Sequence, residues 1–488
     1  MPKSTHETLN RFANTDLPVL LTFLFIGLCL SIAAAFHYVA KVHGELQEEQ
    51  EEQKEQNGDI QREPNGQDHN FGGRADNQSE TIKASNLKIE PVAEGLEFPT
   101  TMAFLGPDDI LVLEKDNGTV RRIINSSLLE KPLLNVNVNT EKELCMCGIA
   151  TSKTVSEHAY VFLYFTEIQT KREKNLEDKE NNPLANRLYR YELIDGNLQN
   201  PKLLLDLPKT AGPHHSGGAV IAGPDGNIYL PVGDPDNIRN KQYIETKAQN
   251  IKDSKDPDGR GGILRITQDG NAVGNGILGD SDPLDKYYAY GIRNSFGIDF
   301  DPVTGYLWDT ENGHAYGDEI NLVLTGFNSG WNKVQGIWTE TKQHTEAKKT
   351  EIDQLVDFSG KGTYSPPEFT WNKTVGPTAL KFLTTDKLGQ EYKNDLFVGD
   401  INNGNIYHFD LNKDRTELVL TGKLSDKVAN SSAEIDESDI VFGQGFGGIT
   451  DIEVGPYDGY LYVLSYRDGG IYRIVNSTSE HPSDFSRQ

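Results

Sequence analysis

The sequence predicts an all-β protein and, within that class, a six-bladed β-propeller. Glycine is abundant, at 47 of 488 residues. Short runs of Val, Ile, Leu and Tyr are separated by Gly, Asp, Asn and Pro, which is typical of strands joined by tight turns. One phrase, made of a turn, a β run and often a second β run, recurs six times. Such units cannot bury both faces alone, so we expect them to close into a ring.

The six repeats are degenerate and unevenly spaced. Each begins with a turn rich in Gly, Pro or Asp, or with the polar residues before a β run. They start at Gly106, Glu157, Gly223, Asp301, Tyr392 and Gly455. The long interval between Asn312 and Tyr392 is expected to hold inserted loops, which in propellers gather on the face that carries binding sites.

Composition divides the chain into five segments. Residues 17–40 form an uncharged apolar run that is long enough to cross a bilayer as a helix, so residues 1–16 are predicted to be a cytoplasmic tail. Residues 41–85 are acidic and nearly without apolar side chains, which predicts a disordered linker. The propeller is predicted over 86–477, with a C-terminal tail at 478–488.

The same features predict an exported protein. Lys3 and Arg11 precede the apolar run, which places the N-terminus in the cytoplasm and the propeller on the extracellular side of the cell membrane. Ala33 to Ala35 also fit a signal-peptide cleavage site, in which case the body is secreted. Sequons for a glycoprotein lie at Asn77, Asn117, Asn125, Asn372, Asn430 and Asn476. The formal charge of −26 argues against a nucleic-acid partner.

The three cysteines do not form the disulfide framework of a small secreted domain. Cys29 lies in the apolar run. Cys145 and Cys147 are two residues apart on a predicted strand and therefore point to one face. They either bind a soft metal such as copper, with Met146 or a histidine, or are buried as small hydrophobic side chains, which is the interpretation we favour.

Several segments occur in an order that resembles one enzyme family. They include "HHSGGAVIAGPDGNIYLPVGD", "YGIRNSFGIDFDP", "ENGHAYGDEINLV" and "GFGGITDIEVGPYDGYLYVLSY". In this order they are similar to the glucose/sorbosone dehydrogenase family of quinoproteins, which are sugar dehydrogenases that use pyrroloquinoline quinone (PQQ) and calcium. The resemblance runs from about Leu87 to Val475, and the fold it implies is a six-bladed propeller.

The resemblance implies roles for several polar residues. His215, rather than His214, takes the place of the family's catalytic base, and imidazole titrates near neutral pH as such a base must. Arg293 and Asn294 match the pair that contacts the cofactor, and Glu143 falls near the substrate. From residue type alone, a histidine before a strand is more often a loop residue, and an arginine such as Arg293 is more often a structural partner of a carboxylate.

A calcium site is implied by the segment "ENGHAYGDEIN". Its ligands would be the backbone carbonyls of Gly313 and His314, together with Glu311, because hard cations take oxygen donors. Glu311, Asp318 and Glu319 either bind a second, structural calcium or are solvated turn residues.

The chain departs from the family where a lysine and two arginines hold the carboxylates of the quinone. Those places are occupied here by Asn402, Gly448 and Thr450. Lys381 and Arg467 lie nearby in the sequence and are candidates for replacement charge.

The predicted function is oxidation of a sugar or related polyol by hydride transfer to PQQ with calcium, followed by electron transfer to an external acceptor. The alternatives are a propeller that has lost PQQ and binds a glycan or protein, and a calcium-dependent hydrolase of lactones or esters.

Overall fold

A computed structural model describes residues 79–478 of the chain, except 141, 153–158, 169–183, 209–213, 235–244, 315 and 338–351. The chain divides into two units, Met1–His69 and Asn70–Gln488, and every described residue belongs to the second. The predicted tail 1–16, the apolar run 17–40 and nearly all of the tail 478–488 lie outside the described residues. Within the described part, no helix is both long and apolar enough to span a bilayer.

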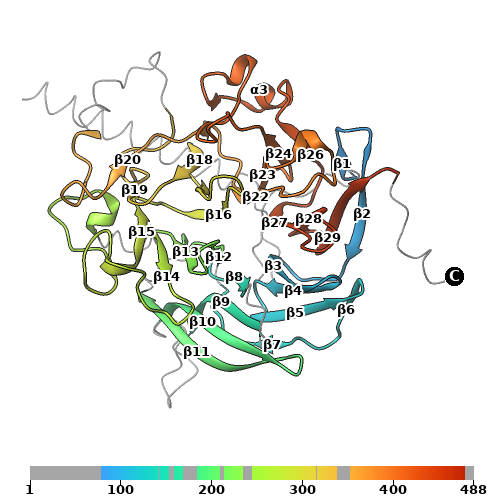
Figure 1. Cartoon of the computed structure of the whole chain (residues 1–488), viewed down its shortest axis with the longest axis horizontal. Helices are drawn as coiled ribbons and strands as arrows, with labels where there is room; N and C mark the ends of the chain where they lie inside the picture. The colour runs from blue at the N-terminus through green and yellow to red at the C-terminus, as the bar shows by residue number, and fades with distance from the viewer. Residues whose placement is uncertain are drawn as a thin grey trace, which may run out of the picture. The chain divides into compact units, whose positions relative to one another are not determined.

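The described strands form six sheets arranged in a ring (Figure 1). The first sheet contains β3 (Pro99–Gly106), β4 (Asp109–Glu114), β5 (Thr119–Ile124), β6 (Ser127–Leu128) and β7 (Leu134–Asn135). The second contains β8 (Met146–Thr151), β9 (Ala159–Ile168), β10 (Leu184–Ile194) and β11 (Asn197–Pro208). The third contains β12 (Ile221–Ala222), β13 (Ile228–Val232), β14 (Gly262–Ile266), β15 (Tyr287–Tyr290), β19 (Phe327–Asn328) and β20 (Thr363–Tyr364).

The remaining three sheets complete the ring and confirm the prediction of an all-β propeller. The fourth contains β16 (Ser295–Phe300), β17 (Leu307–Glu311), β18 (Asp318–Val323), β21 (Phe369–Trp371) and β25 (Val428–Ala429). The fifth contains β22 (Pro377–Phe382), β23 (Leu396–Asp400), β24 (Ile406–Phe409), β26 (Val441–Gln444) and β1 (Thr81–Ile82). The sixth contains β27 (Ile449–Val454), β28 (Leu461–Ser465), β29 (Gly470–Asn476) and β2 (Leu87–Ala93).

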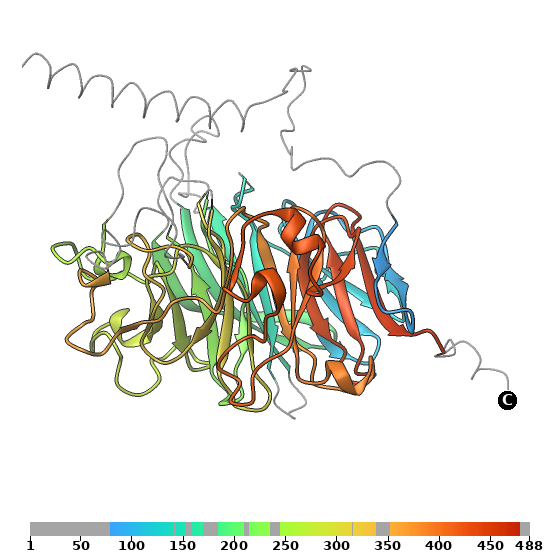
Figure 2. The same cartoon turned by 90° about the horizontal axis from the view of Figure 1, so that it is seen from above.

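The helical elements whose bounds are described are single turns in the connections. These are η2 (Lys247–Gln249), η3 (Leu284–Lys286), η4 (Gln390–Tyr392), η5 (Gly422–Leu424) and α3 (Ser432–Asp436). The inner strands β3, β8, β12, β16, β22 and β27 lie around the centre of the ring (Figure 1), and most neighbouring sheets contact one another through them. Figure 2 shows the ring from the side, with the strands running between its two faces.

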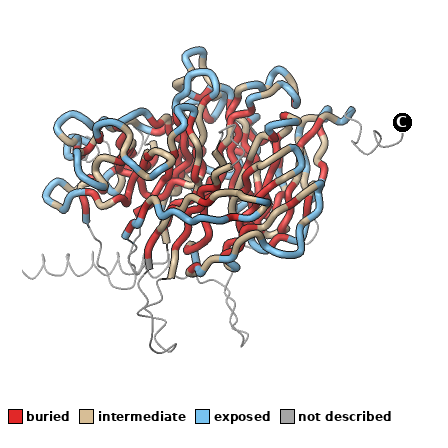
Figure 3. Tube along the Cα trace, turned by 60° about the horizontal axis from the view of Figure 1, so that its bottom comes forward, coloured by how far each residue is buried: buried red, intermediate tan, exposed pale blue. Residues whose placement is uncertain are grey.

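Burial follows from the position of each strand in its sheet. The second strands β13, β17, β23 and β28 consist entirely of buried residues, because the neighbouring sheets cover both of their faces. The outer strand β11 has mostly exposed residues, with buried ones at intervals. Figure 3 shows the same gradient, with the interior of the ring buried and its outer connections exposed.

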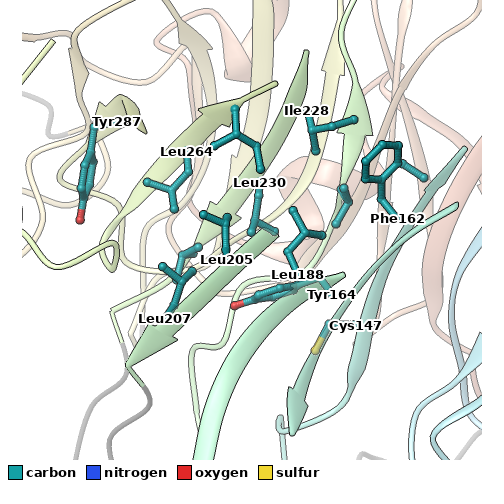
Figure 4. Close-up of a cluster of buried hydrophobic side chains, with 14 of the residues drawn as sticks. Cys147, Phe162, Tyr164, Leu188, Leu205, Leu207, Ile228, Leu230, Leu264 and Tyr287 are labelled. Carbon is teal, nitrogen blue, oxygen red and sulfur yellow. The ribbon is translucent and has the colours of Figure 1, made fainter. Parts of the chain in front are cut away.

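Apolar side chains fill the space between adjacent sheets. Between the second and third sheets, Phe162 and Leu188 pack with Leu230 and Leu264, all fully buried (Figure 4). Burying one such side chain contributes roughly 1.5–3 kcal/mol. These interfaces hold the sheets in fixed positions, and with them the loops at the strand ends.

The ring is closed by strands from distant parts of the chain. In the sixth sheet β2 pairs antiparallel with β29, with Leu87 opposite Asn476. The short strand β1 pairs with β26 in the fifth sheet. The predicted linker 41–85 therefore extends too far toward the propeller, because Thr81 and Ile82 find backbone partners at the edge of that sheet.

The long interval before Tyr392 contains more strand than predicted. We expected inserted loops there, but the interval also contributes β19 and β20 to the third sheet and β21 to the fourth. β19 pairs in parallel with both β15 and β20, so it adds to the outer edge of the third sheet. The segment 338–351 lies outside the described residues.

Candidate active site

The loops at one end of the ring carry most of the predicted site residues. Inner strands begin at this end and second strands finish there, because the two are antiparallel. Glu143, His215 and Arg293 precede the inner strands β8, β12 and β16. Asp234 and Gly313 follow the second strands β13 and β17. Three consecutive sheets therefore direct these residues to one end.

Both histidines contact the carboxylate of Glu143. Glu143 Oε1 lies 3.1 Å from Nδ1 of His214, and Oε2 accepts a 2.7 Å hydrogen bond from the backbone N–H of His215. Burial opposes ionisation of this carboxyl group, but the contacts with the two histidines outweigh burial and lower the pKa of Glu143 to about 2. Glu143 is thus a carboxylate anion that positions the histidine pair.

The buried imidazole of His215 has a defined tautomer. Nδ1 lies 2.9 Å from the carbonyl oxygen of Asp234, and only 5% of the residue is exposed. Because a carbonyl only accepts hydrogen bonds, Nδ1 carries a hydrogen, and in the neutral imidazole Nε2 therefore carries the lone pair. The backbone of His215 has φ of 58°, in the left-handed region that is unfavourable for a residue with a side chain. Such strain is commonly held at functional positions, and Nε2 is suited to accept a proton.

Asp234, which the sequence analysis did not select, connects the base to the rest of the site. Its backbone N–H donates to the carbonyl of Arg293 at 2.7 Å. Its carboxylate accepts from the amide of Gln249 in η2 and, at 2.7 Å, from the indole N–H of Trp331. Asp234 therefore fixes His215 and Arg293 relative to each other.

Arg293 makes further contacts through its backbone N–H and its guanidinium. Its backbone N–H donates to Glu311 Oε1 at 2.6 Å, and its guanidinium carbon lies 5.4 Å from the ring centre of Trp331. Nη1 donates to the carbonyls of Asn312 and Gly313 at 2.7 and 2.8 Å. The predicted cofactor contact and the predicted calcium ligand Gly313 are therefore neighbours in space.

Asn294 also lies at this point of the ring. Its Oδ1 is buried and has no hydrogen-bond donor among the described residues. A Cβ at Gly233 would lie 2.9 Å from this oxygen and 2.6 Å from the carbonyl oxygen of His215. Only glycine permits this close approach, so Gly233 brings the base beside the Arg293–Asn294 pair.

The oxygen atoms around Gly313 are suited to bind a hard cation. The carbonyl oxygens of Asn312 and Gly313 both accept hydrogen bonds from the guanidinium of Arg293. Asn312 Oδ1 is a buried oxygen without a hydrogen-bond donor among the described residues. Hard cations such as calcium take this kind of oxygen set. His314 is exposed, and its role as a calcium ligand stays a prediction.

Glu311, Asp318 and Glu319 are not solvated turn residues, because each is at most 5% exposed. Burial and the charge of Glu319 raise the pKa of Glu311 well above its usual range. Burial raises the pKa of Glu319 to about 7. The hydroxyl oxygen of Ser329 lies between the two carboxylates, 2.7 Å from Glu311 and 3.3 Å from Glu319, and its single hydrogen can be donated to either. A carboxylate pair of this kind is suited to share a proton or to bind a cation.

Two of the three departures from the family have structural explanations. Thr450 donates its hydroxyl to the carbonyl of Pro99 at 2.9 Å and so joins β27 to β3. Gly448 has φ of +84°, which a residue with a side chain rarely adopts. Lys381 is not a replacement charge at the site, because its ammonium pairs with Glu453 at 2.8 Å and Asp299 at 3.6 Å.

Cys145 and Cys147 form a disulfide, so neither predicted interpretation was complete. Both are buried, as predicted, but their sulfurs are bonded to each other and do not form a metal site. The register of β8 on β9 shifts between Met146 and Gly148, which makes a β-bulge at Cys147. The bulge brings the two Cα atoms to 5.1 Å, within disulfide range. The sequence spacing alone does not reveal this bulge.

A second polar cluster lies at the opposite end of the ring. His408 Nε2 is 3.1 Å from Asp395 and 3.8 Å from Asp410, and the three have ligand atoms close enough to share a metal ion. Asp395 precedes β23 and Asp410 follows β24, whereas the site residues lie at the other ends of second strands. This cluster is therefore not part of the candidate site.

Comparison with known proteins assigns the class of this propeller. The family model for Glucose / Sorbosone dehydrogenase matches residues 96–473, a range that contains the inner strand of every sheet. The chain therefore belongs to the glucose/sorbosone dehydrogenase family. This confirms the family inferred from the sequence and the prediction that the chain is a sugar dehydrogenase.

Individual relatives are distant but cover most of the chain. The aldose sugar dehydrogenase of Escherichia coli K12 is 23% identical over 79% of this chain and 92% of its own length. The quinoprotein glucose dehydrogenase B of Acinetobacter calcoaceticus is 28% identical over 62% of this chain and 66% of its own length. The PQQ-bound aldose sugar dehydrogenase of Streptomyces coelicolor is 20% identical, with a TM-score of 0.56 over 83% of this chain and 99% of that one. That likeness shows the shared fold.

Proposed function

We propose that this protein oxidises the C1 hydroxyl of an aldose, or a hydroxyl of a related polyol, with PQQ and calcium. The observation that carries the proposal is the buried imidazole of His215, held in one tautomer by Asp234. Family membership and the PQQ-bound structural neighbour support the same chemistry.

The chain's own groups would divide the chemistry as follows. When bound, PQQ supplies the acceptor for a hydride. His215 Nε2 takes the hydroxyl proton as the hydride leaves, and Glu143 keeps the imidazole in place. The guanidinium of Arg293 stabilises negative charge that develops beside it. The carbonyls of Asn312 and Gly313 and the amide oxygen of Asn312 would hold the calcium.

The test is reconstitution of the purified propeller. The protein is incubated with PQQ and calcium and desalted, retained quinone is measured by absorbance, and dye reduction is assayed with a panel of aldoses. We expect retained quinone and sugar-dependent dye reduction. Absence of both would overturn the proposal. Hydrolysis of lactones or esters without quinone would favour the hydrolase, and glycan binding without turnover would favour a binding module.

We also propose that the propeller lies outside the cell, tethered through residues 17–40 or released after their removal. The sequons at Asn117, Asn125 and Asn430 lie on exposed residues, as glycosylation requires. Treating the protein from its native source with an N-glycosidase should increase its gel mobility, and external protease should degrade it on intact cells. A protein that is unglycosylated and protected from protease would contradict this location.

A further inference from the structure

Arg467 lies at the place where the chain lacks the expected positive charges. It follows β28, in the turn that leads to β29. Its backbone N–H donates to the carbonyl of Gly447 at 2.9 Å, and the neighbouring N–H of Tyr466 donates to the carbonyl of Gly448 at 2.7 Å. The Arg467 turn is thus bonded to the segment that precedes β27.

The guanidinium of Arg467 lies over Gly448. A Cβ placed on Gly448 would be 3.3 Å from Nη1 of Arg467 and 2.7 Å from the carbonyl oxygen of Ile401. A side chain at Gly448 would therefore compete with Arg467 for the same space. The glycine at this position and the arginine in the next turn are complementary.

This place belongs to the same end of the ring as His215. Ile401 and Asn402 directly follow β23, a second strand, and Gly448 directly precedes β27, an inner strand. Asn402 lies next to Gly376, because a Cβ on Gly376 would be 3.3 Å from Asn402 Nδ2. The charge of Arg467 is therefore presented where two of the three expected cations are missing.

Two other cations, Lys381 and Lys115, are already paired. Lys381 binds Glu453 and Asp299, and the ammonium of the buried Lys115, at the end of β4, lies 2.6 Å from Asp116. By contrast, Arg467 is partly buried and its guanidinium makes no ion pair with a carboxylate of the described residues. Its neighbour Asp468 is engaged by the N–H of Gly447 and the hydroxyl of Ser465.

We propose that Arg467 binds a carboxylate of the ligand in the candidate active site and replaces the family's missing cations. This inference rests on the proposed function, in which the ligand is PQQ, a tricarboxylic acid. A guanidinium is suited to this role because it presents paired donors that match a carboxylate. Because a hydrogen bond to a charged group is strong, we expect its removal to weaken binding roughly 10- to 100-fold.

The experiment titrates the calcium-loaded apoprotein with PQQ and follows quenching of tryptophan fluorescence, which does not depend on turnover. Arg467→Gln should weaken binding of PQQ by this factor, and Arg467→Lys should restore part of the affinity. Arg190→Gln is a matched control, because Arg190 lies on β10, the third strand of the second sheet, and pairs with Asp269. It should bind PQQ like the wild type.

Repeating the titration with the trimethyl ester of PQQ separates charge from packing. The ester lacks the anionic carboxylates, so wild type and Arg467→Gln should bind it equally. Equal binding of PQQ itself by both proteins would overturn the role of Arg467 and leave the proposed function intact. A wild type that binds no PQQ would overturn the proposed function and the role together. If Arg467→Gln does not fold, Arg467→Lys takes its place in the comparison. A ratio of PQQ affinity to ester affinity that is the same in Arg467→Lys as in the wild type would refute specific carboxylate recognition by the guanidinium.

Discussion

Lys381 should be essential for stability and dispensable for ligand binding. Its ammonium lies on β22 between Glu453 of β27 and Asp299 of β16, so it links the inner strands of three consecutive sheets. The side chain is 17% exposed. Burial alone would lower the pKa of Lys381, but these carboxylates hold that pKa above its usual range. The substitution Lys381→Met removes the charge and keeps a side chain of similar length.

The distances set the size of the effect. At an effective dielectric constant of about 20, the 2.8 Å and 3.6 Å pairs correspond to gross attractions of about 6 and about 5 kcal/mol. Desolvation of the ions offsets much of this, and removing one partner of a buried pair usually costs about 3–5 kcal/mol. We therefore expect Lys381→Met to lower the free energy of unfolding by about 3–5 kcal/mol at pH 8.

The loss should be smaller at lower pH. Burial and the charge of Glu453 raise the pKa of Asp451, in the same cluster, to about 8. A carboxyl group whose folded pKa is raised binds its proton more tightly in the folded state, so its stabilising contribution is lost as pH rises through that pKa. Removing Lys381 strengthens this effect, so the difference from wild type should shrink between pH 8 and pH 6.

The assay is urea unfolding followed by circular dichroism, at pH 6 and pH 8, with Lys423→Met as the control. Lys423 forms an ion pair of 2.6 Å with Glu437, but both side chains are more than 60% exposed, so this variant should unfold like the wild type. Adding Glu453→Gln to Lys381→Met should recover part of the loss. Equal stability of Lys381→Met and wild type at pH 8, or weaker PQQ binding by a folded Lys381→Met, would refute the assignment.

Three further predictions concern the candidate site. His215→Gln should keep bound quinone but reduce turnover roughly 10²- to 10⁴-fold, measured by dye reduction, and undiminished turnover would remove the base. Glu143→Gln should lower turnover at every pH from 5 to 9, because the pKa of about 2 keeps Glu143 ionised throughout. The pH profile should also move to lower pH as the charge that favours protonated imidazole is lost, and an unshifted profile would contradict this positioning role. Replacing Cys145 and Cys147 together by Ser should lower the free energy of unfolding by about 1.5 kcal/mol, the loop entropy of so short a ring. Equal unfolding midpoints in urea for this variant and the wild type would argue against a stabilising disulfide.

The fold was predictable because its signals are local. The repeats beginning at Gly106, Gly223, Asp301 and Gly455 each mark the turn between the inner strand and the second strand of the same sheet. Turn residues and apolar runs act over a few positions, so they are visible without knowledge of the tertiary structure. By contrast, β19 was missed, since its pairing partners are set by packing and not by its two residues.

The candidate site was predictable only in part. His215, Arg293 and Gly313 were selected by their motifs, and the structure brings them to one end of the ring. Asp234 was missed, although it ends an apolar run in a Gly-Asp pair, because its partner Trp331 is 97 residues away. The position of Arg467 over Gly448 likewise depends on how two turns pack against each other, and the sequence of neither turn predicts this contact.

The pairing of β2 with β29 also constrains how the protein is made. β2 leaves the ribosome early, but its partner strand is synthesised last of the described strands. Until then β2 and one edge of β28 lack their strand partner, and such unpaired edges are prone to pair with other chains. The ring therefore closes only after synthesis of the whole propeller. Truncation before Gly470 would leave an incomplete ring that is prone to aggregate, and not a smaller active enzyme.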